Sequence, residues 1–135
     1  MTLPNLVISL DLAKRMDAKL KKAGLWRESI FWWNTAYSPD KSKTISWIDK
    51  ERYTPKYADE SSYSAYTAGE IGEMLPDKIG DFSKICGFLT IAHVGAYWEI
   101  GYTYKNKLLF DSKENKSLAE SAGLMLEYMV DNKLV

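Results

Sequence analysis

The stretch that decides the fold runs from Cys86 to Tyr104 and reads CGFLTIAHVGAYWEIGYTY. Its first part, Cys86 to His93, is a short apolar run that favours a buried strand. Its last part, Tyr97 to Tyr104, alternates residue by residue, so one face of a second strand would carry large apolar side chains. These are Trp98, Ile100, Tyr102 and Tyr104. Val94 and Gly95 link the two segments, which predicts an antiparallel pair of strands.

The chain after this pair continues the sheet and then closes it with a helix. Lys105-Asn106-Lys107 is typical of a tight turn, in which Asn106 suits a left-handed conformation, and it leads to a third strand over Leu108 to Asp111. Ser117 to Glu120 has the capping-box pattern that opens a helix. An apolar stripe at helical spacing follows and predicts that this helix covers the sheet. Its members are Leu118, Ala122, Met125, Leu126 and Met129.

The chain before Cys86 begins with a helix. Apolar residues at helical spacing predict it over Leu10 to Ala23, with Ser9 as its N-cap and Gly24 at its C-terminal end. Aromatic and β-branched residues then predict two strands, over Ser29 to Ala36 and over Thr44 to Lys50. A connection that contains the turn sequence Ser-Pro-Asp joins them into a hairpin.

A polar stretch and a short helix complete the chain. Arg52 to Ser64 mixes proline, acidic residues and serine with tyrosine, and we assign it as a loop. Thr67 to Glu70 is a second capping box, and the helix it opens should end near Leu75 because Pro76 disfavours helical conformation in the residue before it. No strand-helix-strand alternation is evident, which favours α+β over a parallel sheet. We therefore expect one domain over residues 1–135, an antiparallel sheet of four to five strands packed by an N-terminal and a C-terminal helix, with one short middle helix.

Composition excludes several classes of protein. The 18 Lys and Arg residues balance the 18 Asp and Glu residues, so binding of nucleic acid through bulk charge is not expected. Aromatic residues make up 13% of the chain, which argues against disorder. Cys86 is the single cysteine, so no intramolecular disulfide can form, and a reducing compartment is indicated. With no apolar run long enough for a membrane span, we expect a soluble, cytoplasmic protein.

Motifs for catalysis or cofactor binding are not evident, so no cofactor and no metal are expected. Cys86 and His93 lie on one predicted strand, about 23 Å apart at ~3.3 Å per residue, and their side chains would diverge. Phosphate-binding glycine loops do not occur in the chain, and one His with one Cys cannot build a usual zinc site. Glu70, Glu73 and Asp77 would form either a solvated acidic face or a site for a hard cation.

The aromatic residues are the feature that most needs explanation. Trp32 and Trp33 are adjacent on a strand, so their side chains leave opposite faces of the sheet, and one indole is partly exposed unless helices cover both faces. The same holds for the adjacent residues Tyr97 and Trp98. Tyrosines also recur through the polar loop, where they would either pack as a satellite core or form a recognition surface. Arginine could supply a planar cation beside such rings. The candidate binding residues are Trp32, Trp33, Arg27, Arg52, Tyr53, Tyr57 and Tyr97.

Three blocks of the sequence occur in a familiar combination. They are Ser9 through Gly24 with Glu28 to Trp32 after it, then Ala65 to Pro76, and lastly Ser117 to Leu134. Together they resemble a group of small uncharacterised proteins encoded by phages, prophages and related bacterial genomes. The resemblance implies a mobile-element setting and a stand-alone domain, and it supplies no reaction, cofactor or catalytic residue.

Three functions follow as hypotheses. The first is a non-enzymatic interaction protein of phage or prophage type that binds a protein partner, or a second copy of itself, through an aromatic surface or an exposed strand edge. The second is a binding module for a nucleotide or another anionic small ligand, using aromatic stacking with Arg27, Arg52 or lysines of the first helix. The third is an enzyme with an unrecognised site, which would need a carboxylate pair or His93 in a pocket.

Overall fold

The computed structural model describes residues 6–80, 86–105 and 107–135 and has the α+β fold that the sequence predicts. The described strands form two antiparallel sheets where a single sheet was expected. The three-stranded sheet has the order β2-β1-β3 and contains β1 (Trp32–Tyr37), β2 (Thr44–Asp49) and β3 (Ser61–Ser64). The five-stranded sheet contains β4 (Lys78–Gly80), β5 (Cys86–Val94), β6 (Tyr97–Tyr104), β7 (Lys107–Leu108) and β8 (Lys113–Asn115).

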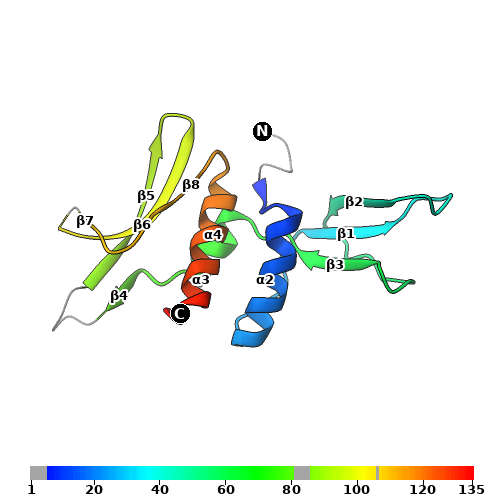
Figure 1. The fold of residues 1–135 in the computed structure, drawn as a ribbon, viewed down its shortest axis with the longest axis horizontal. Helices are drawn as coiled ribbons and strands as arrows, with labels where there is room; N and C mark the ends of the chain where they lie inside the picture. The colour runs from blue at the N-terminus through cyan, green and yellow to red at the C-terminus, as the bar shows by residue number, and fades with distance from the viewer. Residues whose placement is uncertain (1–5, 81–85, 106) are drawn as a thin grey trace.

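A layer of helices lies between the two sheets, which occupy opposite ends of the molecule (Figure 1). Its members are α2 (Leu10–Ala23), α3 (Ala68–Met74) and α4 (Leu118–Asp131). The predicted ends of α2 are confirmed, because the Ser9 hydroxyl accepts the Leu12 N–H at 3.3 Å and Gly24 adopts a left-handed φ of 73°. In the described part of the chain, none of the helices combines the length and hydropathy needed to cross a membrane.

The three helices meet at Gly123, in the middle of α4. A methyl group built on this glycine would lie 2.8 Å from Ile8 Cγ2, 2.8 Å from Leu12 Cδ2 and 3.5 Å from Ile71 Cδ1. The first two distances are shorter than side chains tolerate, so only glycine permits this approach of α2 to α4. Fully buried side chains surround the contact and form the core; they include Met16, Leu20, Tyr66, Ile100, Tyr102, Met125, Leu126 and Met129.

A half-buried carboxylate also joins the N-terminal ends of α2 and α4. Ser117 caps α4 as predicted, since its hydroxyl accepts the Glu120 N–H at 3.2 Å. The Glu120 side chain crosses to the other helix, where Oε1 accepts the Ser9 N–H at 2.8 Å and Oε2 accepts the Ser9 hydroxyl at 2.7 Å. In a capping box, a Glu or Gln three residues after the N-cap accepts the N-cap backbone N–H. In α2 that position is Leu12, which has no side-chain acceptor, so Glu120 of α4 accepts the Ser9 N–H instead.

Several strand predictions need correction. The loop expected over Arg52 to Ser64 ends in β3, whose serine-rich sequence gives no apolar alternation and which is held by backbone pairing with β1. The strand expected over Leu108 to Asp111 is limited to Lys107–Leu108 in β7, and the chain pairs again with β6 only at β8. Asn106, expected in a left-handed turn, lies outside the described residues, while Lys105 beside it has a φ of 49°.

The contact at Gly123 gives the first prediction. Gly123→Ala should lower the free energy of unfolding by about 1–3 kcal/mol, because the added methyl group overpacks the junction of the three helices. Gly72→Ala is the matched control, since Gly72 lies in α3 and a methyl group there meets nothing within 4 Å. The control should be neutral or stabilise by up to about 1 kcal/mol. Urea denaturation measures both, and equal stability of Gly123→Ala and the native chain would contradict the packing.

Candidate protein-binding surface

The candidate residues on the three-stranded sheet are largely engaged in internal contacts. Trp32 is buried, and the Arg52 guanidinium lies over its ring with 4.7 Å between Cζ and the ring centroid. Trp33 leaves the opposite face, as predicted, and its Nε1 donates to the Ile8 carbonyl oxygen at 2.8 Å. The structure therefore pairs Trp32 with Arg52 and directs Trp33 towards the helix layer.

The Asn34 side chain holds the tyrosine-rich loop against β1 through hydrogen bonds. Its side chain is 1% exposed, and its amide nitrogen donates to the Glu51 carbonyl oxygen at 3.0 Å. Its amide oxygen accepts the Tyr53 N–H at 3.0 Å and the Ser62 hydroxyl at 2.8 Å. The loop thus folds back over β1, and the Tyr53 ring packs edge-on against Trp47 at 5.7 Å. This is the satellite core that one of the two sequence-based interpretations predicts for Tyr53.

A second buried polar group, Glu60, closes the same loop. Its Oε2 accepts the Lys56 N–H at 2.8 Å, the Tyr53 hydroxyl at 3.1 Å and the Tyr57 N–H at 3.3 Å. Burial alone would raise the pKa of the Glu60 carboxyl, but these hydrogen bonds outweigh it and hold that pKa below its ordinary value. Sequence reasoning missed both anchors; the available signal was the polar Asn34 inside an aromatic strand.

The lowered pKa of Glu60 predicts a pH dependence for the loop. Because the folded-state pKa is depressed, the stabilisation is complete above the ordinary value of 4.5 and is lost as the pH falls through the lower folded value. The amide NMR shifts of Lys56 and Tyr57 should therefore titrate together with a midpoint below 4.5. Glu60→Gln keeps an acceptor and should abolish this titration. An unchanged titration in Glu60→Gln would contradict the assignment.

Arg27 contacts two residues of α3. Arg27 Nη2 donates to the Glu70 carbonyl oxygen at 3.0 Å, and Nη1 lies 3.4 Å from a Glu73 carboxylate oxygen. The Glu70 carboxylate accepts the Thr67 N–H of its predicted capping box at 2.9 Å and the Ser29 hydroxyl at 2.7 Å. Among the described residues, no group of three His, Cys, Asp or Glu side chains is placed to hold a metal ion.

The two residues considered as a reactive pair share a strand, as predicted, but the expectation that this strand is buried is wrong, because Phe88, Ile91 and His93 are exposed. Cys86 begins β5 and His93 is the residue before its end. The His93 imidazole is stacked on the Trp98 indole, with 4.3 Å between ring centroids and 10° between ring planes. The Cys86 side chain, which was expected to be a small buried hydrophobe, lies outside the described part of the structure.

Tyr57 and Tyr97 remain exposed, at opposite ends of the molecule. Tyr57 lies near the tip of the three-stranded sheet, where its ring meets the edge of Tyr37 at 5.7 Å and Lys41 Nζ lies 5.1 Å from its centroid. Tyr97 lies on the five-stranded sheet, opposite Val94 in the β5–β6 register. The structure therefore does not bring these two tyrosines together.

Tyr97 belongs to an exposed apolar face of the five-stranded sheet. Cross-strand partners share a face, so the register places Phe88 with Thr103, Val94 with Tyr97, and Leu108 with Thr103 on one side. We call this side the outer face; it includes Lys78, Phe88, Thr90, Ala92, Val94, Tyr97, Glu99, Gly101, Thr103, Leu108 and Glu114. The opposite side carries the buried Ile100 and Tyr102.

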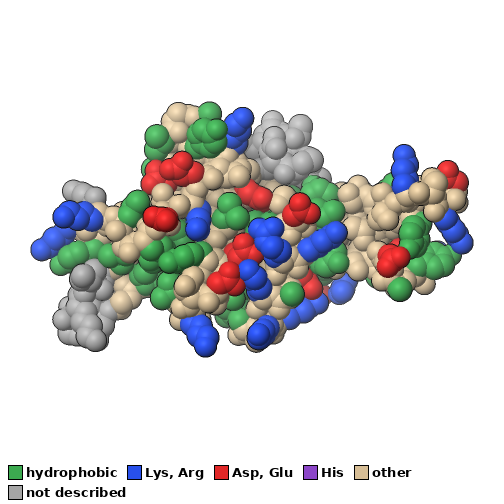
Figure 2. Space-filling model, in the orientation of Figure 1, with side chains coloured by type: hydrophobic (Ala, Val, Ile, Leu, Met, Phe, Trp, Pro, Cys, Tyr) green, Lys and Arg blue, Asp and Glu red, His purple; other side chains and the backbone are tan. Residues whose placement is uncertain are grey.

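Four large side chains of the outer face are about half exposed. The exposed fractions are 50% for Phe88, 57% for Val94, 46% for Tyr97 and 46% for Leu108. Figure 2 shows hydrophobic side chains gathering over this end of the molecule, whereas charged side chains gather over α2 and α4. An exposed apolar patch of this kind is typical of an interaction surface.

A shallow hollow lies in the middle of the outer face. It measures about 410 Å³ and is lined by Thr90, Ala92, Glu99, Gly101, Thr103 and Leu108. Gly101 lies beneath the Leu108 side chain, since a methyl group on this glycine would lie 2.8 Å from Leu108 Cδ2. Phe88 lies towards one end of the strand pair, and Val94 with Tyr97 lies at the other. The face therefore combines half-exposed apolar side chains with a depression that fits one more.

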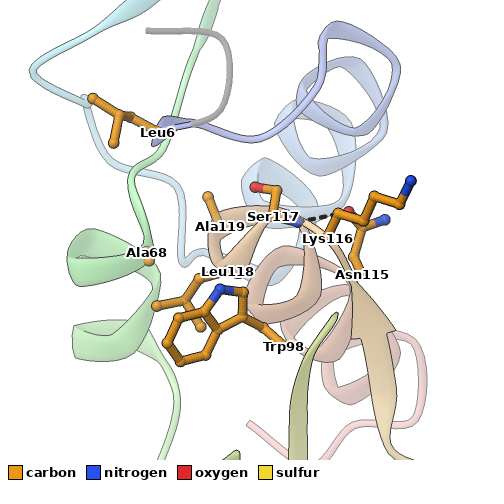
Figure 3. Close-up of a pocket in the computed structure, with 8 residues that line it drawn as sticks. All are labelled: Leu6, Ala68, Trp98, Asn115, Lys116, Ser117, Leu118 and Ala119. Carbon is orange, nitrogen blue, oxygen red and sulfur yellow. Dashed lines mark hydrogen bonds between the residues drawn. The ribbon is translucent and has the colours of Figure 1, made fainter. Parts of the chain in front are cut away.

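A larger pocket, of about 560 Å³, lies between the helix layer and β6 (Figure 3). Trp98 and Leu118 form one side of it, and Leu6 lies across from them. Its polar lining is partly satisfied internally, because the Ser117 N–H donates to Asn115 Oδ1 at 3.0 Å. Lys116 is the one charged side chain among the described residues that line it. The pocket thus lacks the converging polar groups that a specific small ligand needs.

Comparison of the chain with family models, curated proteins and solved structures finds no match.

Proposed function

We propose that this protein is a non-enzymatic interaction module that binds a protein partner through the outer face of the five-stranded sheet. The half-exposed side chains of Phe88, Val94, Tyr97 and Leu108 around the hollow carry this proposal. Interfaces are dominated by apolar and aromatic anchors that fill pockets, and aromatic residues are enriched among their hot spots. Burying one Val, Leu or Phe side chain is worth about 1.5–3 kcal/mol before the costs of association.

The charges beside the hollow support a partner that is both apolar and basic. Glu99 of β6 and Glu114 of β8 are directly opposite each other in the register. Like charges in that position destabilise a sheet. None of the ion pairs found among the described residues involves either carboxylate. A partner that inserts an apolar side chain into the hollow and places a Lys or Arg near these carboxylates would relieve the repulsion.

The other hypotheses receive less support from the contacts. A module for nucleotides or other anionic ligands was expected to use Arg27 and Arg52, but Arg27 contacts Glu70 and Glu73, and Arg52 covers Trp32. The phage or prophage setting suggested by the sequence resemblance stays part of our proposal, and it would place the partner among proteins of that setting.

Site-specific photocrosslinking in cells tests the proposed function. A benzophenone amino acid in place of Tyr97 should capture one main partner, whereas the same amino acid in place of Tyr57 should not. The pair is matched, since Tyr57 and Tyr97 are 48% and 46% exposed and lie at opposite ends of the molecule. The same capture at both positions would contradict a binding surface on the outer face.

Titration of the purified partner then measures how much a residue of the outer face contributes to the dissociation constant. Val94→Asn should weaken binding roughly tenfold, about 1.4 kcal/mol, by placing an amide in the apolar contact. Ile30→Asn is the matched control, because Ile30 is 63% exposed but precedes the three-stranded sheet, and it should leave the dissociation constant unchanged. An unchanged dissociation constant for Val94→Asn would overturn the proposal.

A further inference from the structure

We propose that the edge strand β2 pairs with β2 of a second copy of this chain, antiparallel and with Ser46 opposite Ser46. The pairing would join the two three-stranded sheets into one continuous sheet with three strands from each copy. It rests on different residues from the outer face and goes beyond the binding function proposed above.

β2 has an open edge that its sequence does not protect. It lies at the edge of its sheet, next to β1 alone (Figure 1). Natural edge strands are commonly blocked by proline, an inward charge, a bulge or a charged lysine within the strand. The six residues of β2, TISWID, contain no proline and no lysine. Thr44, Ile45 and Ser46 are exposed, so their half of the edge is accessible.

The hairpin register tells which backbone groups of β2 point outward. The Ser38 N–H donates to the Lys43 carbonyl oxygen at 2.8 Å, so Lys43 directs its backbone groups towards β1. In an antiparallel pair this direction alternates from residue to residue. Thr44, Ser46 and Ile48 therefore direct their N–H and C=O groups to the open edge. A second strand can hydrogen-bond only by placing its own outward-pointing residues opposite these three.

Side-chain complementarity selects one register from those that the backbone permits. With Ser46 opposite Ser46, Thr44 lies opposite Ile48, Ile45 opposite Trp47, and Lys43 opposite Asp49. Each of these residue pairs occurs twice, once on either side of the two-fold axis, as a symmetric interface requires. Shifting the register by one permitted step places Lys43 opposite Trp47 or Ile45 opposite Asp49. The first register differs from both shifted ones in that it sets no charged side chain opposite an apolar one.

The groups that form the new ion pairs are accessible. Lys43 and Asp49 are both exposed, and neither takes part in an ion pair found among the described residues. Asp49 Oδ1 accepts the Lys50 N–H at 2.7 Å, which leaves Oδ2 for the partner's lysine. The five-stranded sheet lies at the other end of the molecule, so the dimer would present two outer faces and gain avidity for a repeated partner.

Light scattering coupled to gel filtration tests the dimer. The native chain should show twice its mass of 15.4 kDa as its concentration rises from about 1 μM to 1 mM. Lys43→Asp and Asp49→Lys should each weaken the dimer at least tenfold, and the double charge exchange should restore it. Val94→Asn should not change the mass. A monomer at all concentrations, no rescue by the exchange, or loss of the dimer in Val94→Asn would overturn the proposal.

Cysteine crosslinking tests the register, with the single native cysteine replaced by Cys86→Ala. Ser46→Cys should form a disulfide-linked dimer on mild oxidation, because a hydrogen-bonded antiparallel pair has a Cα separation of about 5.5 Å, within disulfide range. Thr44→Cys is the matched control and should not crosslink, since Thr44 would lie opposite Ile48. Equal crosslinking of the two variants, or none in Ser46→Cys, would overturn the assigned register.

Discussion

The close approach of α2, α3 and α4 at Gly123 is the constraint on which the rest of the structure depends. The glycine lets Ile8 and Leu12 pack directly against α4, and the Glu120 carboxylate joins the N-terminal ends of α2 and α4 beside it. Both sheets are attached to this layer. Trp33 of β1 donates to the Ile8 carbonyl oxygen at 2.8 Å, and the Ser121 hydroxyl of α4 donates to the Trp98 carbonyl oxygen of β6 at 2.8 Å. We infer that the helices make the two sheets one cooperative unit.

The helices were predictable from the sequence because their signals are local. Ser9, Gly24 and the capping box at Thr67 act within a few residues of themselves, and their predicted roles are confirmed. The division of the strands between two sheets was not predictable, because it depends on which distant strands pair. β3 is the clearest case, since its sequence is serine-rich and its pairing with β1 spans the whole tyrosine loop.

The candidate site was predictable only in part, for a similar reason. A count of aromatic residues points to Trp32 and Tyr53 as strongly as to Tyr97. The structure distinguishes Tyr97, which is exposed, from Trp32 and Tyr53, which pack inside the protein. The packing of Tyr53 depends on Asn34 and Glu60, two polar side chains that anchor the loop over the sheet. The hollow was not predictable either, because it depends on how Leu108 of β7 packs over Gly101 of β6.

Native-state hydrogen exchange tests the central claim most directly. If the helix layer joins the two sheets, the most protected amides of β1 and of β6 should exchange through openings of equal free energy, close to the free energy of global unfolding. Opening of β1 at a free energy several kcal/mol below that of β6 would show that the three-stranded sheet unfolds on its own, and would contradict the account.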